Sequence, residues 1–327
     1  MNESEGGSPS LPAAMPEPTV LLFGSTAVGK TAALGTIATD TNSPPIEIIS
    51  ADSRQVYRDM DIGTAKPDSE EQRRTRYHLI DVVSPRESWD VGQFVEAADE
   101  LIPEIRRRSA LPVICGGTAF YHQGYLLGLP GTPRASRETR LQLEERLYRE
   151  GLEELRRELR SVDPESDRRI AANDRYRVLR ALEVYHTSGY PLSSYVPPTT
   201  PRPGVAPQVV GLYRPRQELY RRISARVDQM FTAGLSEEVG WLLEKGYKPT
   251  DPGLQTIGYR EFFQVGGTPP WSDTILGKVR DAVDRNTRRY AKRQETFFKR
   301  IPGVQWIHAD DVHALLQTFE PLLDTVR

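Results

Sequence analysis

Four short apolar runs in the first third of the chain alternate with segments of helical period. The runs have strand length and β character, and they are Val20–Phe23, Ile46–Ser50, His78–Val83 and Leu111–Cys115. Apolar residues at helical spacing cover Thr31–Thr39, Val91–Arg108 and Ala119–Leu127, and Pro103 is expected to kink or break the second of these helices. Strands that alternate with helices at this spacing predict a parallel α/β sheet flanked by helices.

The pattern changes at Leu129, where strand candidates stop. After a break at Pro130–Pro133, the segment Arg137–Ser188 has helical period throughout, and a Pro-rich run over Val196–Gly204 closes it. Val209–Tyr213 then predicts another strand. A helical block between two pieces of α/β pattern predicts an inserted all-helical domain.

The C-terminal third is mostly helical. Helical period covers Gln217–Ala233, Ser236–Lys245 and Ser272–Arg300, and a short strand at Val304–Ile307 precedes a closing helix. We therefore predict a helical insertion at residues 130–200, carried on an α/β core formed by residues 19–129 and 201–327.

Composition agrees with a globular protein that has a sizeable core. Of the 327 residues, 38% are hydrophobic and 27% are charged, and no apolar run approaches the length of a membrane span. Residues 1–18 are rich in Ser, Pro and Glu, which predicts a disordered tail, and they lack the features of a signal peptide, so we expect a cytoplasmic protein. The single cysteine, Cys115, excludes an internal disulfide and a Cys-based zinc module, and its apolar neighbours predict a core position.

Positive charge is concentrated near the C-terminus, although the whole chain has a net charge of −2. Between Lys278 and Arg300, nine basic residues stand against three acidic ones, which gives a local charge of +6. A charge run is usually the solvated face of a helix, but like charges at helical spacing repel one another unless a polyanion is nearby. The segment therefore predicts contact with a polyanion such as a nucleic acid.

The first predicted strand runs directly into a glycine-containing loop. The loop Gly24-Ser25-Thr26-Ala27-Val28-Gly29-Lys30-Thr31 matches the phosphate-binding pattern G-x-x-x-x-G-K-S/T at every fixed position. Backbone N–H groups of such a loop bind an oligophosphate, Lys30 reaches its terminal phosphates, and the Thr31 hydroxyl binds Mg²⁺. The sequence therefore predicts a fold like that of P-loop NTPases, with Mg²⁺ as cofactor.

Two further polar residues stand at predicted strand ends. Asp52 follows the second strand, and Thr118 follows the fourth strand after two glycines. Ligands of open parallel sheets bind beyond the carboxyl ends of the strands, so both side chains are expected to converge on whatever the loop holds, although each is also a typical helix cap. Two reactions fit these parts: phosphoryl transfer by a small-molecule kinase, or a transfer with a diphosphate leaving group, with Asp52 accepting a proton in either.

A set of motifs in one order favours the second reaction. The motifs are Gly24–Thr31, Ile48–Tyr57, Met60–Pro67, His78–Asp81, Gly116–Thr118, Asn173-Asp174 with Arg177 and Arg180–Val184, Ile257–Tyr259 and Thr287–Thr296. Together they resemble bacterial tRNA dimethylallyltransferases. The resemblance implies transfer of a dimethylallyl group from dimethylallyl diphosphate to N6 of the adenosine 3′ of the anticodon in tRNA.

The resemblance also implies roles for single residues. Asp52 matches the family's general base, and Thr118 matches its threonine on the diphosphate and the tRNA. The loop amides, Lys30 and Mg²⁺ would stabilise the leaving diphosphate. Arg226 is our candidate for an additional diphosphate clamp, with Arg222 second; for either, the alternative is a solvated helix position.

Matches to the family's tRNA-contacting positions are spread along the chain. They are Asp52, Ser53, Arg54, Gln55, Thr118, Arg140, Tyr176, Arg177, Val178, Leu179, Arg180, Gln255, Thr256, Ile257, Gly258, Tyr259, Arg260, Lys292, Arg293, Gln294 and Phe297. Tyr176 and Phe297 replace a usual Gln and a usual Trp, which weakens them as individual contacts. The stretch Lys292–Lys299 interleaves basic and aromatic residues, as suits backbone contact and base stacking, whereas core burial is the alternative for Phe297 and Phe298.

Two other functions remain open at this point. An adenylate (cytokinin-type) dimethylallyltransferase would use the same crevice, but a mononucleotide acceptor needs neither a helical insertion nor the basic segment. A P-loop kinase or RNA-binding ATPase would instead consume the γ-phosphate of ATP. Under the leading hypothesis the partners are the tRNA anticodon stem-loop and dimethylallyl diphosphate, no membrane is involved, and we expect a monomer.

Overall fold

The computed structural model describes residues 18–38, 45–134 and 136–326. It divides into two compact units, one formed by Met1–Leu126 with Arg202–Arg327 and the other by Leu127–Pro201. We call the first the sheet unit and the second the helical unit, and each is described by itself. The expected disordered tail, residues 1–18, lies outside the described residues except for Pro18.

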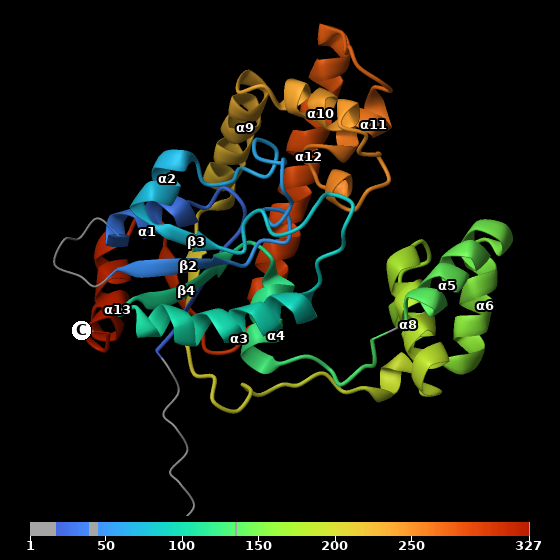
Figure 1. Cartoon of the computed structure of the whole chain (residues 1–327), viewed down its shortest axis with the longest axis horizontal. Coiled ribbons are helices and arrows are strands. Elements are labelled where there is room, and N and C mark those ends of the chain that lie inside the picture. Colours follow the sequence, from blue (N-terminus) through green and yellow to red (C-terminus); the bar gives the residue numbers. More distant parts are fainter. Residues whose placement is uncertain (1–17, 39–44, 135, 327) are drawn as a thin grey trace, which may run out of the picture. The chain divides into compact units, whose positions relative to one another are not determined.

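A parallel six-stranded sheet forms the centre of the sheet unit, with the strand order β3-β2-β4-β1-β5-β6 (Figure 1). The strands are β1 (Val20–Phe23), β2 (Ile46–Ser50), β3 (Arg76–His78), β4 (Leu111–Gly116), β5 (Gln208–Tyr213) and β6 (Gln305–His308). Every residue of β1, β2 and β4 is buried, as expected for inner parallel strands covered on both faces. The prediction of a parallel α/β sheet is confirmed.

Successive side chains of β1 point to opposite faces of the sheet and pack in a different core on each face. Val20 and Leu22 join a core cluster that includes Leu34 of one flanking helix and Leu315 of another. Phe23 points to the opposite face, where its ring stacks on Phe298 at 4.5 Å between centroids. Figure 1 shows α1, α2 and α13 on one side of the sheet and α3 and α4 on the other.

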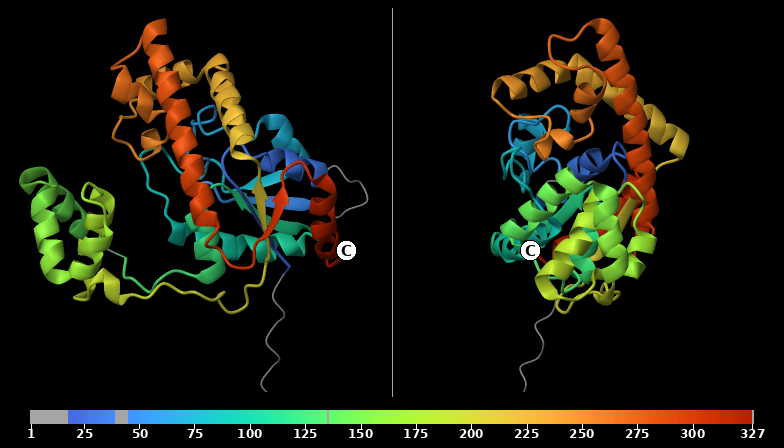
Figure 2. Two further views of the ribbon diagram at one scale, coloured as in Figure 1. Left: turned by 180° about the vertical axis from the view of Figure 1, so that it is seen from behind. Right: turned by 90° about the vertical axis from the view of Figure 1, so that its right-hand side faces the viewer.

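Nine α-helices belong to the described part of the sheet unit. They are α1 (Lys30–Ala38), α2 (Ser69–Arg74), α3 (Val91–Arg107), α4 (Ala119–Leu127), α9 (Arg216–Thr232), α10 (Leu235–Glu244), α11 (Arg260–Val265), α12 (Asp273–Phe298) and α13 (Val312–Asp324). Figure 2 shows β5 and β6 side by side near α13. The short helices α2 and α11, and the 3₁₀ turn η2 (Gly253–Gln255), were not predicted.

One sequence expectation needs correction, and a second is narrowed. The predicted strand at His78–Val83 is wrong, because β3 ends at His78, and Leu79 and Asp81 have positive φ angles of 60° and 56° that no strand adopts. No break occurs at Pro103, since α3 continues through it from a capping box on Asp90. The apolar residues after β3 instead support the neighbouring loop, where Val82 N–H donates to the Val56 carbonyl at 2.8 Å.

The helical unit has its own small core. Its elements are α5 (Arg137–Glu150), α6 (Leu152–Val162), α7 (Pro164–Arg169), α8 (Arg175–Ser188) and the 3₁₀ turn η1 (Leu192–Ser194). Leu143, Leu155, Leu159 and Leu182 are buried together in it. Gly151, with a φ of 82°, allows the sharp turn from α5 to α6. No strand lies among the described residues of this unit, as the pattern predicted.

No helix in the described ranges combines the length and the apolar character needed to cross a membrane.

Candidate active site

Three neighbouring strands end beside one another. In the sheet, β4 lies between β2 and β1, so the turns after these three strands share one edge. These turns carry Asp52, Thr118 and the phosphate loop, defined as Gly24–Thr31. The strand order therefore places Asp52, Thr118 and the phosphate loop, which are far apart in the sequence, at one edge of the sheet.

The phosphate loop has the curled backbone that its sequence predicts. Ala27 and Gly29 have positive φ angles of 63° and 115°. The Nζ of Lys30 donates to the carbonyls of Gly24 at 2.9 Å and Ser25 at 3.2 Å. Burial lowers the pKa of Lys30, and the nearby Asp52 carboxylate counteracts this effect. An anion bound in the loop would favour the charged amine further.

Asp52 and Thr118 belong to one hydrogen-bonded arrangement. The Oδ1 of Asp52 accepts the Arg54 N–H at 2.9 Å, and the Oγ1 of Thr118 accepts the Ser53 N–H at 2.9 Å. A Cβ placed on Gly117 would lie 2.7 Å from the Nε2 of Gln294, so this glycine allows the Gln294 side chain to approach the turn closely. The turn after β2 is therefore fixed to the turn after β4.

Two arginines of α9 add positive charge beside the loop. The Nε of Arg222 donates to the Ala27 carbonyl at 2.8 Å, so Arg222 contacts the phosphate loop directly. Arg226 is half-buried, and burial lowers its pKa while Asp52 raises it. Arg226 is thus within electrostatic reach of both Asp52 and Lys30.

Arg214 is a loop contact that the sequence reasoning missed. Its Nε donates to the Val28 carbonyl at 2.6 Å, its side chain is 5% exposed, and its guanidinium is paired with Glu218 and Asp310. The signal that could have revealed it is its position, one residue after β5, because β5 pairs with β1 and ends at the same edge.

Gln294 of α12 was expected to contact tRNA, but its side chain is buried beneath the loop. Its Oε1 accepts the Thr26 N–H at 2.9 Å, and its Nε2 donates to the Gly117 carbonyl at 2.7 Å. Only 4% of Gln294 is exposed. It therefore joins the phosphate loop to the turn that carries Thr118.

Of the predicted tRNA contacts near Asp52, Ser53 is half-buried and Arg54 is exposed. Gln55 is engaged inside the protein, since its Nε2 donates to the Ala65 carbonyl at 3.0 Å and its Oε1 accepts the Ser50 hydroxyl at 3.1 Å. An exposed guanidinium two residues from Asp52 suits contact with a polyanionic ligand.

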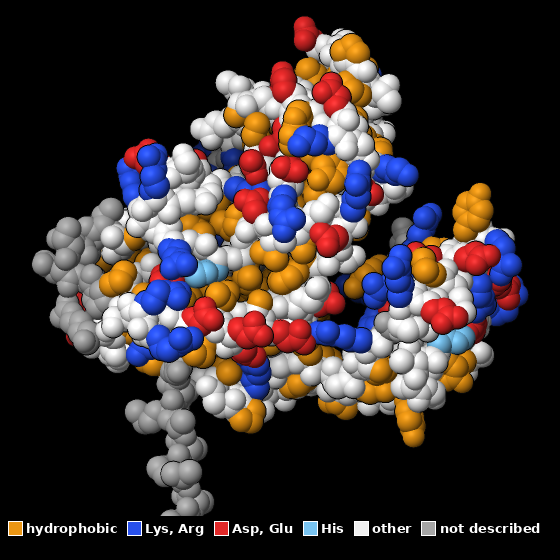
Figure 3. Space-filling view, viewed as in Figure 1, with side chains coloured by type: hydrophobic (Ala, Val, Ile, Leu, Met, Phe, Trp, Pro, Cys, Tyr) orange, Lys and Arg blue, Asp and Glu red, His pale blue; other side chains and the backbone are white. Residues whose placement is uncertain are grey.

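The predicted contacts in the helical unit have different environments. Tyr176 is 77% exposed, whereas Val178 is fully buried and Leu179 packs against the core. Arg140 and Arg180 both pair with Glu183, at 3.1 and 3.3 Å. Arg177 pairs with Asp174 at 3.0 Å. Figure 3 shows Lys and Arg side chains gathered over α8 on the side of this unit seen there.

Most of the predicted segment Gln255–Arg260 serves the interior. Thr256 and Tyr259 are buried, Ile257 is half-buried, and Gly258 has a φ of 104°. Gln255 is exposed, and the Nε of Arg260 lies 3.1 Å from Glu261. Within this segment, only Gln255 presents a fully exposed polar side chain.

The outer face of α12 and the residue directly after the helix carry a basic stripe, which we define as Lys278, Arg285, Arg289, Lys292 and Lys299. These side chains are exposed and repeat at helical spacing, and none has an acidic partner among the described residues. Other basic residues of α12 do have one: Arg280 pairs with Asp228 and Arg288 with Asp284.

The remaining predicted residues of α12 lie next to this stripe. Arg293 is exposed, and its guanidinium lies over the Tyr290 ring at 5.8 Å. Phe297 is half-buried and meets the exposed Phe120 edge to face at 6.5 Å, whereas Phe298 is a core residue. Core burial is thus confirmed for Phe298, and Phe297 keeps a partly open face.

A cavity of about 580 Å³ borders the phosphate loop. Gly24, Ser25 and Val28 form its loop side. The rest of the lining is mixed: it includes the apolar side chains Leu212, Leu219, Phe298 and Trp306, the basic Arg214, Arg216 and Lys299, and also Tyr213 and the acidic Glu295. Hydrocarbon and anionic groups therefore both find complementary surface beside the loop.

Known proteins share this architecture over most of the chain. The tRNA dimethylallyltransferase of Borrelia hermsii is 40% identical over 89% of this chain and 94% of its own length, and that of Heliobacterium modesticaldum is 43% identical over 89% of both chains. The crystal structure of the tRNA isopentenylpyrophosphate transferase from Bacillus halodurans is 34% identical, covers 95% of this chain and 98% of its own, and gives a TM-score of 0.64. A eukaryotic dimethylallyltransferase, whose crystal structures show it acting on tRNA, is 25% identical over 93% of this chain and 77% of its own, with a TM-score of 0.72.

The family model described as IPP transferase matches residues 55–301, which begins just after the Asp52 turn and ends just after α12. Together with relatives about 40% identical over nearly their full length, this match assigns the family. The chain therefore belongs to the IPP transferase family, whose relatives named above are tRNA prenyltransferases.

Proposed function

We propose that the protein transfers a dimethylallyl group from dimethylallyl diphosphate to N6 of the adenosine 3′ of the anticodon in tRNA. The observation that carries this proposal is the meeting of Asp52 and Thr118 with a phosphate loop at one sheet edge, in a chain of this family. The relatives named tRNA dimethylallyltransferase support the substrate class.

The residues suit a substitution at the first carbon of the prenyl chain. The adenine N6 lone pair forms the new C–N bond as the C–O bond to the diphosphate breaks, and the electron pair of that bond leaves with the diphosphate. The amine must lose a proton as the new bond forms, and Asp52 is the carboxylate placed to accept it. Lys30, Arg226, Arg222 and the loop amides stabilise the charge that develops on the leaving group.

Thr31 fits the role of magnesium ligand that the loop sequence predicts. It is the second residue of α1 and is exposed at the loop, so its hydroxyl is accessible to an ion that a bound diphosphate would also contact. The described residues hold no cluster of three or more His, Cys, Asp or Glu side chains suited to a metal, so most ligands would come from diphosphate oxygens and water, as Mg²⁺ prefers. When bound, the ion would neutralise charge on the diphosphate.

The cavity beside the phosphate loop has apolar surface that a prenyl group could contact. Its apolar side chains Leu212, Leu219, Phe298 and Trp306 suit a hydrocarbon attached to a diphosphate.

The anticodon stem-loop supplies the acceptor. Its target base must leave the stack to reach Asp52, as enzymes that modify bases require. The basic stripe of α12 supports contact with the tRNA backbone, and exposed Arg54 and Tyr176 are available for loop contacts. We also propose that the protein is a monomer, which light scattering would test.

The test is a product assay with three arms. Dimethylallyl diphosphate, Mg²⁺ and unmodified tRNA should yield N6-(dimethylallyl)adenosine in the tRNA, detected by nucleoside mass spectrometry. Free AMP offered in competition with an anticodon stem-loop should remain unmodified, which excludes the adenylate transferase. ATP offered with tRNA should keep its γ-phosphate, which excludes a kinase or ATPase. Absence of product with competent tRNA would refute the proposal.

A further inference from the structure

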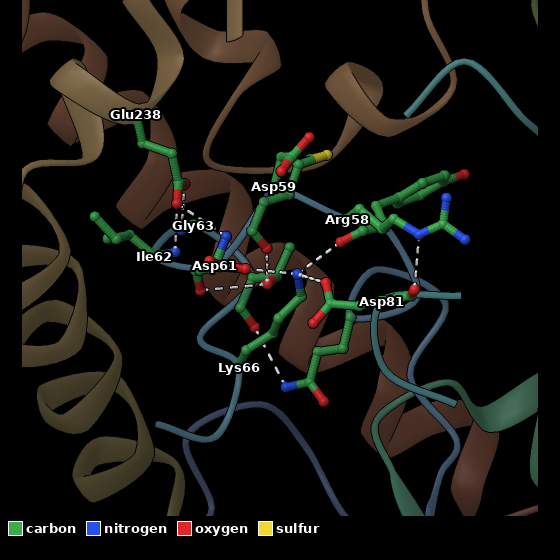
Figure 4. Close-up of polar contacts among 12 residues, drawn as sticks. Arg58, Asp59, Asp61, Ile62, Gly63, Lys66, Asp81 and Glu238 are labelled. Atoms are coloured by element: carbon green, nitrogen blue, oxygen red, sulfur yellow. Dashed lines mark hydrogen bonds and ion pairs between the residues drawn. The ribbon is translucent and has the colours of Figure 1, made fainter. Parts of the chain in front are cut away.

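The loop Tyr57–Lys66, which follows the Asp52 turn, is held by a side chain from a distant helix (Figure 4). The Oε2 of Glu238, on α10, accepts the N–H groups of Asp61 at 2.9 Å and Ile62 at 2.8 Å, and its Oε1 accepts that of Gly63 at 3.3 Å. Consecutive backbone N–H groups that converge in this way form an anion-binding nest. Here the anion is the protein's own carboxylate.

Tyr259 completes this contact. Its hydroxyl donates to the Oε1 of Glu238 at 2.6 Å and accepts the Gly63 N–H at 3.1 Å. Burial, together with the Glu238 carboxylate, raises the pKa of Tyr259 well above its ordinary value, so the phenol remains a donor. A Cβ on Gly63 would lie 2.4 Å from the Tyr259 ring, so only glycine fits against it.

Lys66 fixes the other end of the loop. Its Nζ donates to the Tyr57 carbonyl at 2.6 Å and pairs with Asp61 at 2.6 Å and Asp81 at 2.5 Å. The Lys66 side chain is 4% exposed, whereas both aspartates are exposed by about half or more, at 65% and 48%. One buried amine thus joins the start of the loop, its middle and the segment after β3.

The loop is connected in turn to the catalytic turn. Gln55 donates from its Nε2 to the carbonyl of Ala65, the residue before Lys66, at 3.0 Å. Its Oε1 accepts the hydroxyl of Ser50, the last residue of β2, at 3.1 Å. Asp52 lies between Ser50 and Gln55, so the backbone that carries the carboxylate is supported from both sides.

We propose that Glu238, Tyr259 and Lys66 are positioning residues for the transfer reaction, which hold the Asp52 carboxylate where it meets the adenine amine. The proposal rests on the proposed function of Asp52 as general base. Misplacing a catalytic group by about 1 Å can cost about 10²-fold in rate, so a loop cross-linked at both ends has a direct catalytic effect.

The test begins with Glu238→Gln under single-turnover conditions. The amide keeps the shape of the side chain but turns an NH₂ group toward N–H donors, so the nest loses part of its support. We expect the transfer rate to fall about tenfold or more, while the Kd for an anticodon stem-loop and the KM for dimethylallyl diphosphate change less than about twofold. Glu244→Gln is the matched control, because Glu244 is exposed on the same helix and has no partner among the described residues.

A double-mutant cycle separates positioning from general structural support. If Glu238 acts through Asp52, the Asp52→Asn, Glu238→Gln double variant should react as slowly as Asp52→Asn alone. Additive losses, or a Glu238→Gln rate equal to that of the wild type, would overturn the proposal. If Glu238→Gln does not fold, Tyr259→Phe, which removes one donor to Glu238, is judged by the same cycle. An inactive wild type would refute the proposed function instead, so the two failures are distinguishable.

Discussion

Asp52 is held by its own turn, by Thr118 through Ser53, and by Gln55 through the loop Tyr57–Lys66. Each contact uses a backbone group or an uncharged side chain. Of the two carboxylate oxygens, Oδ1 accepts the Arg54 N–H, which orients the side chain, and Oδ2 has no hydrogen bond to any described residue. This division suits a group that must accept a proton from a substrate.

Asp52→Asn should lower the rate of transfer at least about 10²-fold while tRNA affinity stays nearly unchanged. The amide oxygen can still accept the Arg54 N–H, so the turn keeps its shape, but the side chain no longer accepts a proton. Single-turnover kinetics and filter binding measure the two quantities. Retained activity would assign the base to another residue.

The buried His122 predicts that the free energy of unfolding depends on pH. It is fully buried, and burial lowers its pKa from 6.5 to about 3, against the effect of a hydrogen bond to the Gly116 carbonyl. Between these values the unfolded chain binds a proton that the native protein does not. The free energy of unfolding should therefore fall as the pH decreases below about 6.5, by up to ~1.4 kcal/mol per pH unit from this residue.

His122→Phe tests this contribution. The phenyl ring retains the packing against Phe23 and Phe298, which the imidazole meets edge to face at 5.1 and 6.1 Å, but it does not titrate. Urea unfolding between about pH 5 and 6.5 should show a shallower loss of stability in the variant than in the wild type. Parallel slopes for both proteins would contradict the assignment.

At the scale of elements, α12 has two different faces. Its inner face buries Val279, Val283, Ala291, Gln294 and Phe298, whereas its outer face presents the basic stripe. One helix thus contacts the phosphate loop through Gln294 and offers positive charge to solvent.

Replacing Arg285, Arg289 and Lys292 with Gln should weaken tRNA binding and reduce its salt dependence. Each lost phosphate contact should lower the slope of log K against log salt by about 0.7 to 0.9. The KM for dimethylallyl diphosphate should stay unchanged. Arg280→Gln is the control, because Arg280 already pairs with Asp228 at 2.5 Å, and an equal effect of this variant would refute a specific role for the stripe.

The elements also show what a sequence can and cannot predict. Strands β1, β2 and β4 follow from uninterrupted apolar runs, because an inner parallel strand is buried on both faces. Strand β3 does not, since Arg76–His78 pair with β2 at the sheet edge and His78 contacts Glu47 at 2.7 Å, which no hydrophobic pattern reveals. The two hydrogen bonds of the Gln294 side chain could not be predicted for a related reason, as its partners lie 268 and 177 residues away in the chain.

At the scale of the whole molecule, the helical unit joins the sheet unit through two connections that lie next to each other. The Arg202 N–H donates to the Leu126 carbonyl at 3.0 Å, and Arg202 is anchored further by Asp99 and the Tyr125 carbonyl. The 75 residues from Leu127 to Pro201 therefore form an insertion whose two ends leave the sheet unit at neighbouring positions.

Replacing Leu127–Pro201 with a few Gly and Ser residues should leave a folded protein that still binds diphosphate but no longer modifies tRNA. A short linker is enough, because the Arg202 N–H donates directly to the Leu126 carbonyl. The helical unit has its own core of leucines, so its removal leaves the centre of the sheet unit's core in place. Circular dichroism should show cooperative unfolding of the shortened chain, and the isolated segment should be helical. Collapse of the shortened protein to an unfolded chain would contradict this division.

The adjacent ends of the insertion Leu127–Pro201 have a consequence for evolution. A segment that leaves and returns across one hydrogen bond can lengthen, shorten or be exchanged between lineages without altering the register of any strand. Mutations within Leu127–Pro201 can therefore accumulate without altering the strands that end at the phosphate loop, Asp52 and Thr118.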